Sequence, residues 1–292
     1  MSSKKSKTVL ALTFCTAAVM FSPVAFDWPQ SETKADSFRS YFAQLRGSRI
    51  EASIIFNDSS TDVKCAEDGT VAAVIAEHGN DFGWFESPLG TAVVIAHEDN
   101  LSTVYANLDG DSVPQNFCGG VPAGKKIGES GNSGWQQDGS GLEFQVLDTE
   151  NKACVNPRIL MPRIGEELDL VIGDLTLDDR SGVTHHLLNE RKLPAGSYKL
   201  YHARQEVAVP YTTQVAVNGV TVETMKYDRL LENNGELCVL GNDKYPVKDV
   251  YPDEKRQLLS VLHLAKGHCT LSVFVIDILG KAHQIKYSLE IE

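Results

Sequence analysis

The chain has 292 residues, of which 42% are hydrophobic and 23% are charged, and its formal net charge is −12. This composition is ordinary for globular protein and excludes wholesale disorder, and the length is enough for two domains with separate cores. The negative charge argues against nucleic acid as a partner and against docking on anionic lipid through a basic patch.

Residues 1–25 have the pattern of a secretory signal peptide. A short cluster of lysines is followed by an apolar run over residues 8–20 and by small residues that end at Ala25. The run is short for a membrane-spanning helix, so we expect cleavage near Ala25 and export to the periplasm or cell envelope. An uncleaved anchor is the alternative, and lipidation at Cys15 is disfavoured because the bulky Phe14 precedes the cysteine. No transmembrane segment is expected in the mature chain.

Residues 26–45 are expected to form an N-terminal extension. Within it, the apolar residues of segment 37–45 share helical spacing, which predicts one or two turns of amphipathic helix. From residue 50 onwards the pattern changes to short apolar runs separated by Gly, Asn and Asp, which is typical of β-strands. These strands are expected at residues 50–56, 69–76, 91–97, 102–108 and 142–147.

A break marked by Pro157, Pro162 and Gly165 separates this region from the rest of the chain. Domain boundaries tend to fall in such segments. We therefore expect a first domain over residues 46–164 and a second domain over residues 165–292.

The second domain is expected to be an immunoglobulin-like β-sandwich, so that the predicted fold class of the whole chain is all-β. Seven short strands within one domain of this length are typical of a sandwich. Asn218-Gly219 predicts a tight hairpin, because both central positions of that turn favour positive φ. The strands are expected at residues 168–177, 196–202, 212–222, 236–240, 257–264, 270–276 and 283–291.

Five cysteines would remain after removal of the signal peptide, and this odd number leaves at least one thiol unpaired in each chain. Cys238 and Cys269 lie in separate predicted strands of one domain and could face each other as a disulfide, which an exported protein permits. The alternative is that all five are small buried apolar side chains. The five are Cys65, Cys118, Cys154, Cys238 and Cys269.

Six short motifs follow one another through the first domain. They occupy residues 65–71, 90–97, 102–108, 121–134, 141–146 and 155–157. In order and spacing they resemble the lysostaphin/LytM family of zinc endopeptidases, which cut peptide cross-links in peptidoglycan. The resemblance covers the family's core and implies a LytM-type β-sheet domain.

The residues that carry the family's chemistry are replaced. Zinc in the family is held by the His and Asp of an H-x-x-x-D motif and by the second His of H-x-H, and the resemblance places Glu51, Ile55 and Glu143 at these positions. The two catalytic histidines correspond to Asn107 and Gly141. Zinc needs about three protein ligands and an open water position, and isoleucine has no lone pair to donate. We therefore expect neither metal nor other cofactor, and a pseudoenzyme.

Several of these residues remain candidates for binding. Glu51 and Glu143 are expected to lie close together as the acidic floor of a groove, where they could bind a hard cation weakly or share a proton or a water. Trp84 and Phe85 fall in a loop that lines the groove in LytM-type proteins, and Trp135 lies in the Gly/Ser-rich turn before the H-x-H position. Such aromatic side chains stack on sugars or anchor a protein partner, or alternatively cap the small β core.

The function that these observations favour is that of a LytM-type pseudopeptidase of the cell envelope, a binding or scaffold protein or a regulator of hydrolases. Its expected partner is peptidoglycan or an envelope protein such as a cell-wall hydrolase. One alternative is an active peptidoglycan hydrolase with a relocated site, although no nucleophile motif supports it. Another alternative is a surface adhesin or structural protein.

Overall fold

β-strands dominate the computed structural model, which describes residues 26–76, 87–136, 139–205 and 208–292. The helical elements in these ranges are the one-turn helix α1 (Val247–Val250) and the 3-10 turns η2 (Gly110–Ser112) and η3 (Pro157–Ile159). The predicted all-β class is confirmed, and the predicted signal peptide lies outside the described residues. No helix within the described ranges is long and apolar enough to cross a membrane.

The first half of the chain is built on an antiparallel sheet in the order β12-β11-β8-β7-β6-β9. β4 pairs with the first residues of β11, and β12 pairs with its last residues. Strand β7 is rich in β-branched residues, which favour extended backbone. Tyr105 and Phe144 are fully buried on one face of the sheet, with ring centroids 5.1 Å apart. The strands are β1 (Phe38–Ser40), β2 (Leu45–Arg46), β3 (Arg49–Ile50), β4 (Ile54–Phe56), β5 (Asp62–Lys64), β6 (Gly69–Ile75), β7 (Thr91–Ala96), β8 (Leu101–Leu108), β9 (Gly119–Val121), β10 (Lys126–Glu129), β11 (Glu143–Asp148) and β12 (Ala153–Val155).

The helix predicted over residues 37–45 is wrong. Strand β1 occupies the start of this segment and pairs with β4, so that Phe38 lies opposite Phe56. Ala43 then adopts a left-handed conformation with φ of 65°, which a right-handed helix does not allow. The apolar side chains that suggested a helix, including Tyr41 and Phe42, are nevertheless buried in the core.

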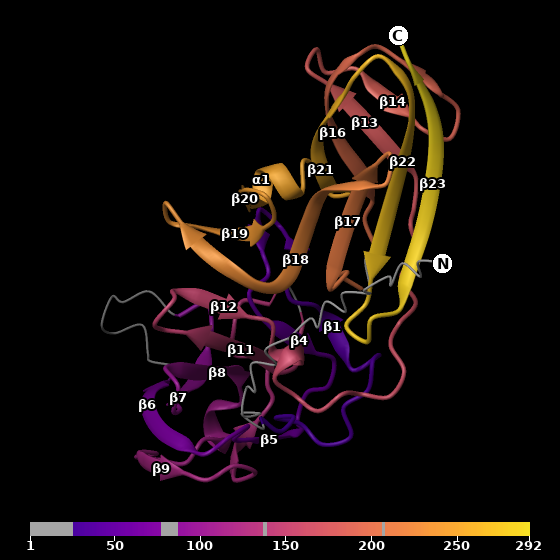
Figure 1. Ribbon diagram of the computed structural model, residues 1–292. Coiled ribbons are helices and arrows are strands. Elements are labelled where there is room, and N and C mark those ends of the chain that lie inside the picture. Colours follow the sequence, from indigo (N-terminus) through magenta and orange to yellow (C-terminus); the bar gives the residue numbers. More distant parts are fainter. Residues whose placement is uncertain (1–25, 77–86, 137–138, 206–207) are drawn as a thin grey trace, which may run out of the picture.

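The second half of the chain has two sheets packed face to face (Figure 1). One has the order β14-β13-β16-β21, and the other contains β15, β23, β22, β17 and β18. Leu177 and Leu200 from the first sheet share one buried cluster with Val215 and Val273 from the second. The strands are β13 (Leu175–Asp179), β14 (Thr184–His186), β15 (Lys192–Leu193), β16 (Gly196–Ala203), β17 (Thr212–Val217), β18 (Val220–Asn233), β19 (Glu236–Leu240), β20 (Lys244–Pro246), β21 (Arg256–Leu264), β22 (Gly267–Ile276) and β23 (Ala282–Ile291).

The hairpin predicted at Asn218-Gly219 is confirmed. Val217 pairs with Val220, and the two turn residues have φ of 53° and 80°. The immunoglobulin-like topology of this half stays a prediction.

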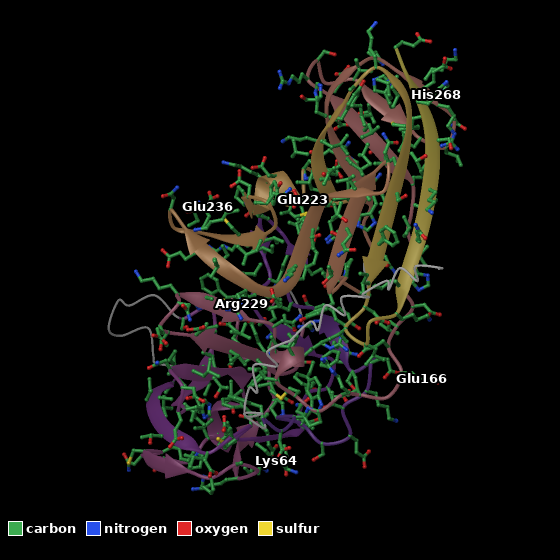
Figure 2. All side chains as sticks on the ribbon, viewed as in Figure 1. Lys64, Glu166, Glu223, Arg229, Glu236 and His268 are labelled. Atoms are coloured by element: carbon green, nitrogen blue, oxygen red, sulfur yellow. The ribbon has the colours of Figure 1, made fainter. Side chains whose placement is uncertain are left out.

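Strand β18 belongs to both halves of the molecule (Figure 1). Its first residues pair with β17, and further along Arg229 pairs with Val155 of β12. Figure 2 labels Arg229 at this crossing. Tyr227 of β18 is buried in a hydrophobic cluster together with Tyr105 and Phe144 of the first half. The main sheet thus continues from one predicted domain into the other, and the boundary between residues 164 and 165 stays an expectation.

The disulfide considered between Cys238 and Cys269 is wrong. All five cysteines of the described ranges are free, and Cys118 alone among them is exposed. Cys238 lies in β19, which pairs with β18 and β20, whereas Cys269 lies in β22 between β17 and β23. Burial raises the pKa of the thiols of Cys154, Cys238 and Cys269, so these thiols stay protonated at neutral pH.

Candidate functional site

The structure brings together the three residues that the resemblance places at the family's ligand positions. Ile55 of β4 and Glu143 of β11 are paired across neighbouring strands, and Glu143 also lies opposite Ala106 of β8. Glu51 lies just before β4 and is linked to Glu143 by a shared contact with Arg46. The predicted proximity of the two glutamates is therefore found.

Arg46 is a member of this site that sequence reasoning missed. It ends β2, in the short hairpin with β3, and its Nη1 atom lies 2.9 Å from Oε2 of Glu51 and 3.5 Å from Oε2 of Glu143. Its Nη2 atom donates to the carbonyl oxygen of Trp135 at 3.2 Å. A signal was available, because two buried carboxylates require a nearby cation and few basic residues lie close to them in sequence.

Neutral donors complete the hydrogen bonding of both carboxylates. Glu51 accepts from the backbone N–H and the hydroxyl of Ser53, at 3.1 Å and 2.6 Å. Glu143 accepts at 3.2 Å from Nε2 of Gln136 and, through its other oxygen, at 3.2 Å from Nε2 of Gln145. The side chains of the two glutamates are only 5% and 9% exposed, so these contacts replace water.

The electrostatics of the site follow from this burial. Burial and the neighbouring Glu51 raise the pKa of Glu143, and Arg46 opposes the rise. For Arg46, burial acts to lower the pKa, but the two carboxylates outweigh it and raise the pKa above its ordinary value. The guanidinium therefore stays charged and neutralises much of the acidic floor that the sequence predicted.

The two positions expected to correspond to the family's catalytic histidines have structural roles. Asn107 is fully buried with φ of 61°, and its Nδ2 atom donates to the carbonyl oxygens of Gly131 and Gly141 at 3.0 Å and 2.7 Å. Its Oδ1 atom accepts from the N–H of Gly134 at 2.7 Å. Gly141 has φ of 117°, and a Cβ atom there would lie 2.1 Å from the carbonyl oxygen of Phe56. Neither position presents a side chain to a reacting group.

The donor set does not fit a zinc ion. Ile55 is buried and apolar, Asn107 is fully engaged with the backbone, and the two glutamates share one guanidinium. Catalytic zinc is held by three N, S or O donors of protein side chains. The described ranges contain no group of three or more His, Cys, Asp or Glu side chains placed to hold a metal.

Of the three aromatic residues expected at the groove, the structure describes Trp135. The Trp135 side chain is exposed (63% for the residue), and the backbone N–H of Trp135 donates to the carbonyl oxygen of Pro88 at 2.9 Å. Trp84 and Phe85 lie outside the described residues. Trp135 is thus an exposed aromatic side chain whose backbone carbonyl is bound by Arg46.

Comparison with known protein families finds two matches along the chain. A family model described as Peptidase family M23 matches residues 50–157. A second model, which has no functional description, matches residues 169–292. The five positions that the resemblance assigns to the family's zinc ligands and catalytic histidines lie inside the first match, whereas Arg46 lies just before it.

Individual proteins give similar results. A protein of Treponema pallidum (strain Nichols), described as uncharacterized, is 33% identical over 120 residues, which cover 38% of this chain and 79% of that protein. The solved structure of LytU is 23% identical, with 41% of this chain and 79% of LytU covered and a TM-score of 0.33. The catalytic domain of the antimicrobial peptidase lysostaphin from Staphylococcus simulans is 22% identical, with 37% and 77% covered and a TM-score of 0.30.

Proposed function

Residues 50–157 of this chain are a domain of peptidase family M23, and on that premise we propose that the protein is a catalytically inactive member that works in the cell envelope as a binding protein. The family connects the chain with the cell wall. The proposal adds that the domain keeps the family's fold but no longer hydrolyses peptidoglycan, and that it binds a partner instead.

The observation that carries this proposal is the position of the Arg46 guanidinium. It contacts both carboxylates at the ligand positions, where a metal ion would have to be. A zinc ion and a guanidinium repel each other at such a distance, and the third ligand position is Ile55, which cannot coordinate. Without the ion the domain has no means of lowering the pKa of a water molecule to near neutrality.

Peptidoglycan, or an envelope protein such as a cell-wall hydrolase, is the proposed partner. Trp135 supports a binding role because it is a large, exposed aromatic side chain beside the replaced metal site. Aromatic rings of this kind stack on sugar faces and anchor protein partners. Binding would involve the rim around Trp135, since Glu51 and Glu143 are already paired with Arg46.

A sedimentation assay with purified peptidoglycan sacculi tests the proposal. We expect the mature protein to sediment with sacculi, to release no soluble peptide fragments and to contain no stoichiometric zinc. Trp135→Ala should weaken binding by about tenfold, in line with the loss of an aromatic anchor. Leu188→Ala is a matched control, because Leu188 is 64% exposed and lies in the second half of the chain.

Three results would count against the proposal. Release of cross-link fragments by the unmodified protein would show an active hydrolase, and about one zinc per chain would show a metal site. Binding to host matrix proteins, with none to sacculi or to envelope proteins, would favour a surface adhesin instead.

A further inference from the structure

The replaced metal site leaves two buried carboxylates that need a positive charge. The side chains of Glu51 and Glu143 are 5% and 9% exposed. Two like charges at such a position destabilise the fold unless a cation lies between them. Arg46 is the cation that contacts both.

Arg39 shows that proximity alone does not give this role. Its guanidinium also lies at the site, but it donates to the carbonyl oxygen of Ser140 at 3.0 Å and to Oε1 of Gln136 at 2.6 Å. Burial and the neighbouring Arg46 lower the pKa of Arg39. Two arginines therefore approach the site, and only Arg46 pairs with its carboxylates.

We propose that Arg46 is a built-in cation that takes over the structural role of the zinc ion in this domain and thereby positions the segment that carries Trp135. The inference rests on the proposed function, because it requires that no zinc occupies the site. Arg46 is a positioning residue in this account and takes part in no reaction.

The contacts of Arg46 join three segments of the chain. Its Nη1 atom links the segment before β4, through Glu51, to β11, through Glu143. Its Nη2 atom holds the carbonyl oxygen of Trp135, and the next residue, Gln136, donates to Glu143 as well. A metal ion joins segments in the same way through its ligands. A guanidinium differs in being covalently attached and charged at every physiological pH, so chelators cannot remove it.

The hairpin that carries Arg46 is itself anchored to the second half of the chain. Nη1 of Arg204 donates to the carbonyl oxygen of Leu45 at 3.3 Å, and the hydroxyl of Tyr251 donates to the carbonyl oxygen of Ala43 at 2.7 Å. The built-in cation is therefore held in place from outside the M23 domain. Arg46 also lies outside the M23 match, which begins at residue 50.

The test replaces Arg46 with a neutral side chain of similar length. We expect Arg46→Met to lower the Tm by roughly 5–10 °C, because one partner of a buried ion pair is removed. Hydrogen exchange at the amides of residues 133–136 should become faster, since the Trp135 carbonyl loses its donor. Arg39→Met is the matched control and should leave both glutamates paired, with a smaller change in Tm.

Calcium and a second substitution distinguish a cation role from simple packing. Millimolar CaCl2 should raise the Tm of Arg46→Met, because a hard divalent cation can bridge the freed carboxylates, and should leave Arg39→Met and the unmodified protein unchanged. Arg46→Met/Glu143→Gln should recover part of the lost Tm, because the repulsion between two carboxylates is removed, and should lose the calcium response. If Arg46→Met alone does not fold, this double variant still tests the role of Arg46.

The failures of the two proposals are distinguishable. An unchanged Tm and unchanged exchange in Arg46→Met, or a loss that neither calcium nor Glu143→Gln reduces, would overturn the role of Arg46. One equivalent of zinc in the unmodified protein would overturn the proposed function itself.

Discussion

Asn156 is hydrogen-bonded across the two halves of the molecule to Tyr227. Its Nδ2 atom donates to the Tyr227 carbonyl oxygen at 3.0 Å, while its backbone N–H donates to the carbonyl oxygen of Asp228 at 2.8 Å. Its Oδ1 atom accepts from the N–H of Arg158 at 3.1 Å and so caps the 3-10 turn η3. One buried side chain thus both ends β12 and attaches it to β18.

Asn156→Ala should therefore lower the free energy of unfolding by about 1–3 kcal/mol, because a buried carbonyl loses its donor and a turn loses its cap. Urea denaturation followed by circular dichroism measures the change. Asn151→Ala is the control, since Asn151 is exposed in a turn and bonds only to Asp148. Equal midpoints for the two variants would show that the Asn156–Tyr227 contact contributes nothing.

A fragment of residues 165–292 should keep the two packed sheets of the second half but lose protection along the outer part of β18. In the whole chain this part pairs with β12, and Tyr227 and Leu230 are buried beside side chains of the first half. We expect a lower Tm than that of the full chain and fast amide exchange at residues 229–231, with slow exchange kept in β22. If β18 were equally protected in both proteins, the halves would be energetically independent.

Gly141→Ala should be strongly destabilising, by roughly 2–4 kcal/mol, because its φ of 117° and the carbonyl oxygen of Phe56 at 2.1 Å from a Cβ both oppose a side chain. Gly182→Ala separates the two effects, since Gly182 has φ of 84° but open space around it, and should cost about 1 kcal/mol. Calorimetry on both variants measures the difference. Histidine at position 141 would meet the same obstacle, so restoring this catalytic residue of the family should destabilise the domain in the same way. A stable Gly141→His protein would contradict this.

His202 makes stability depend on pH. Its side chain is buried and bonds through Nε2 to Oε1 of Gln257 at 3.3 Å. Burial lowers the pKa of His202 to about 4, although the contact with Gln257 opposes the shift. The unfolded chain binds a proton below about pH 6.5 while the folded chain does not, so stability is lost as the pH falls from about 6.5 to about 4.

His202→Gln should remove this part of the pH dependence, which amounts to about 3 kcal/mol at most. The free energy of unfolding, measured at pH 7, 5.5 and 4, should fall less steeply in the variant than in the unmodified protein. His186→Gln, at an exposed position, is the control and should keep the original slope. Parallel slopes for all three proteins would show that His202 is not buried in its neutral form.

Local sequence patterns were sufficient to predict much of the fold. The runs at residues 91–97, 102–108 and 142–147 coincide with β7, β8 and β11 to within a residue, because a strand buried on one face has a clear apolar pattern. The outer part of β18 was missed. Charged and apolar residues alternate along its sequence only up to Leu230-Leu231, where the pattern typical of a strand is lost. There Leu230 is buried and Leu231 is partly buried, because β12 and β19 pair with β18 on either side.

The sequence predicted which metal-binding and catalytic residues are replaced, and it did not predict the contacts that Arg46 makes with the two glutamates. The resemblance to the LytM family placed Glu51, Ile55 and Glu143 together, and the pairing of β4 with β11 brings Ile55 beside Glu143. Arg46 lies outside every motif, and its position depends on a hairpin anchored by Arg204 from the other half of the chain. The contact between Arg204 and Leu45 joins segments so distant in sequence that it leaves no local signal.

The shared strand β18 also determines how the molecule would respond to tension. A pull that separates its two halves would have to break the ladder between β12 and β18, the hydrogen bonds of Asn156 and the apolar cluster around Tyr227 at the same time. A flexible linker would instead extend freely under load. A force applied to one half would therefore be carried to the other through β18 and its contacts with β12.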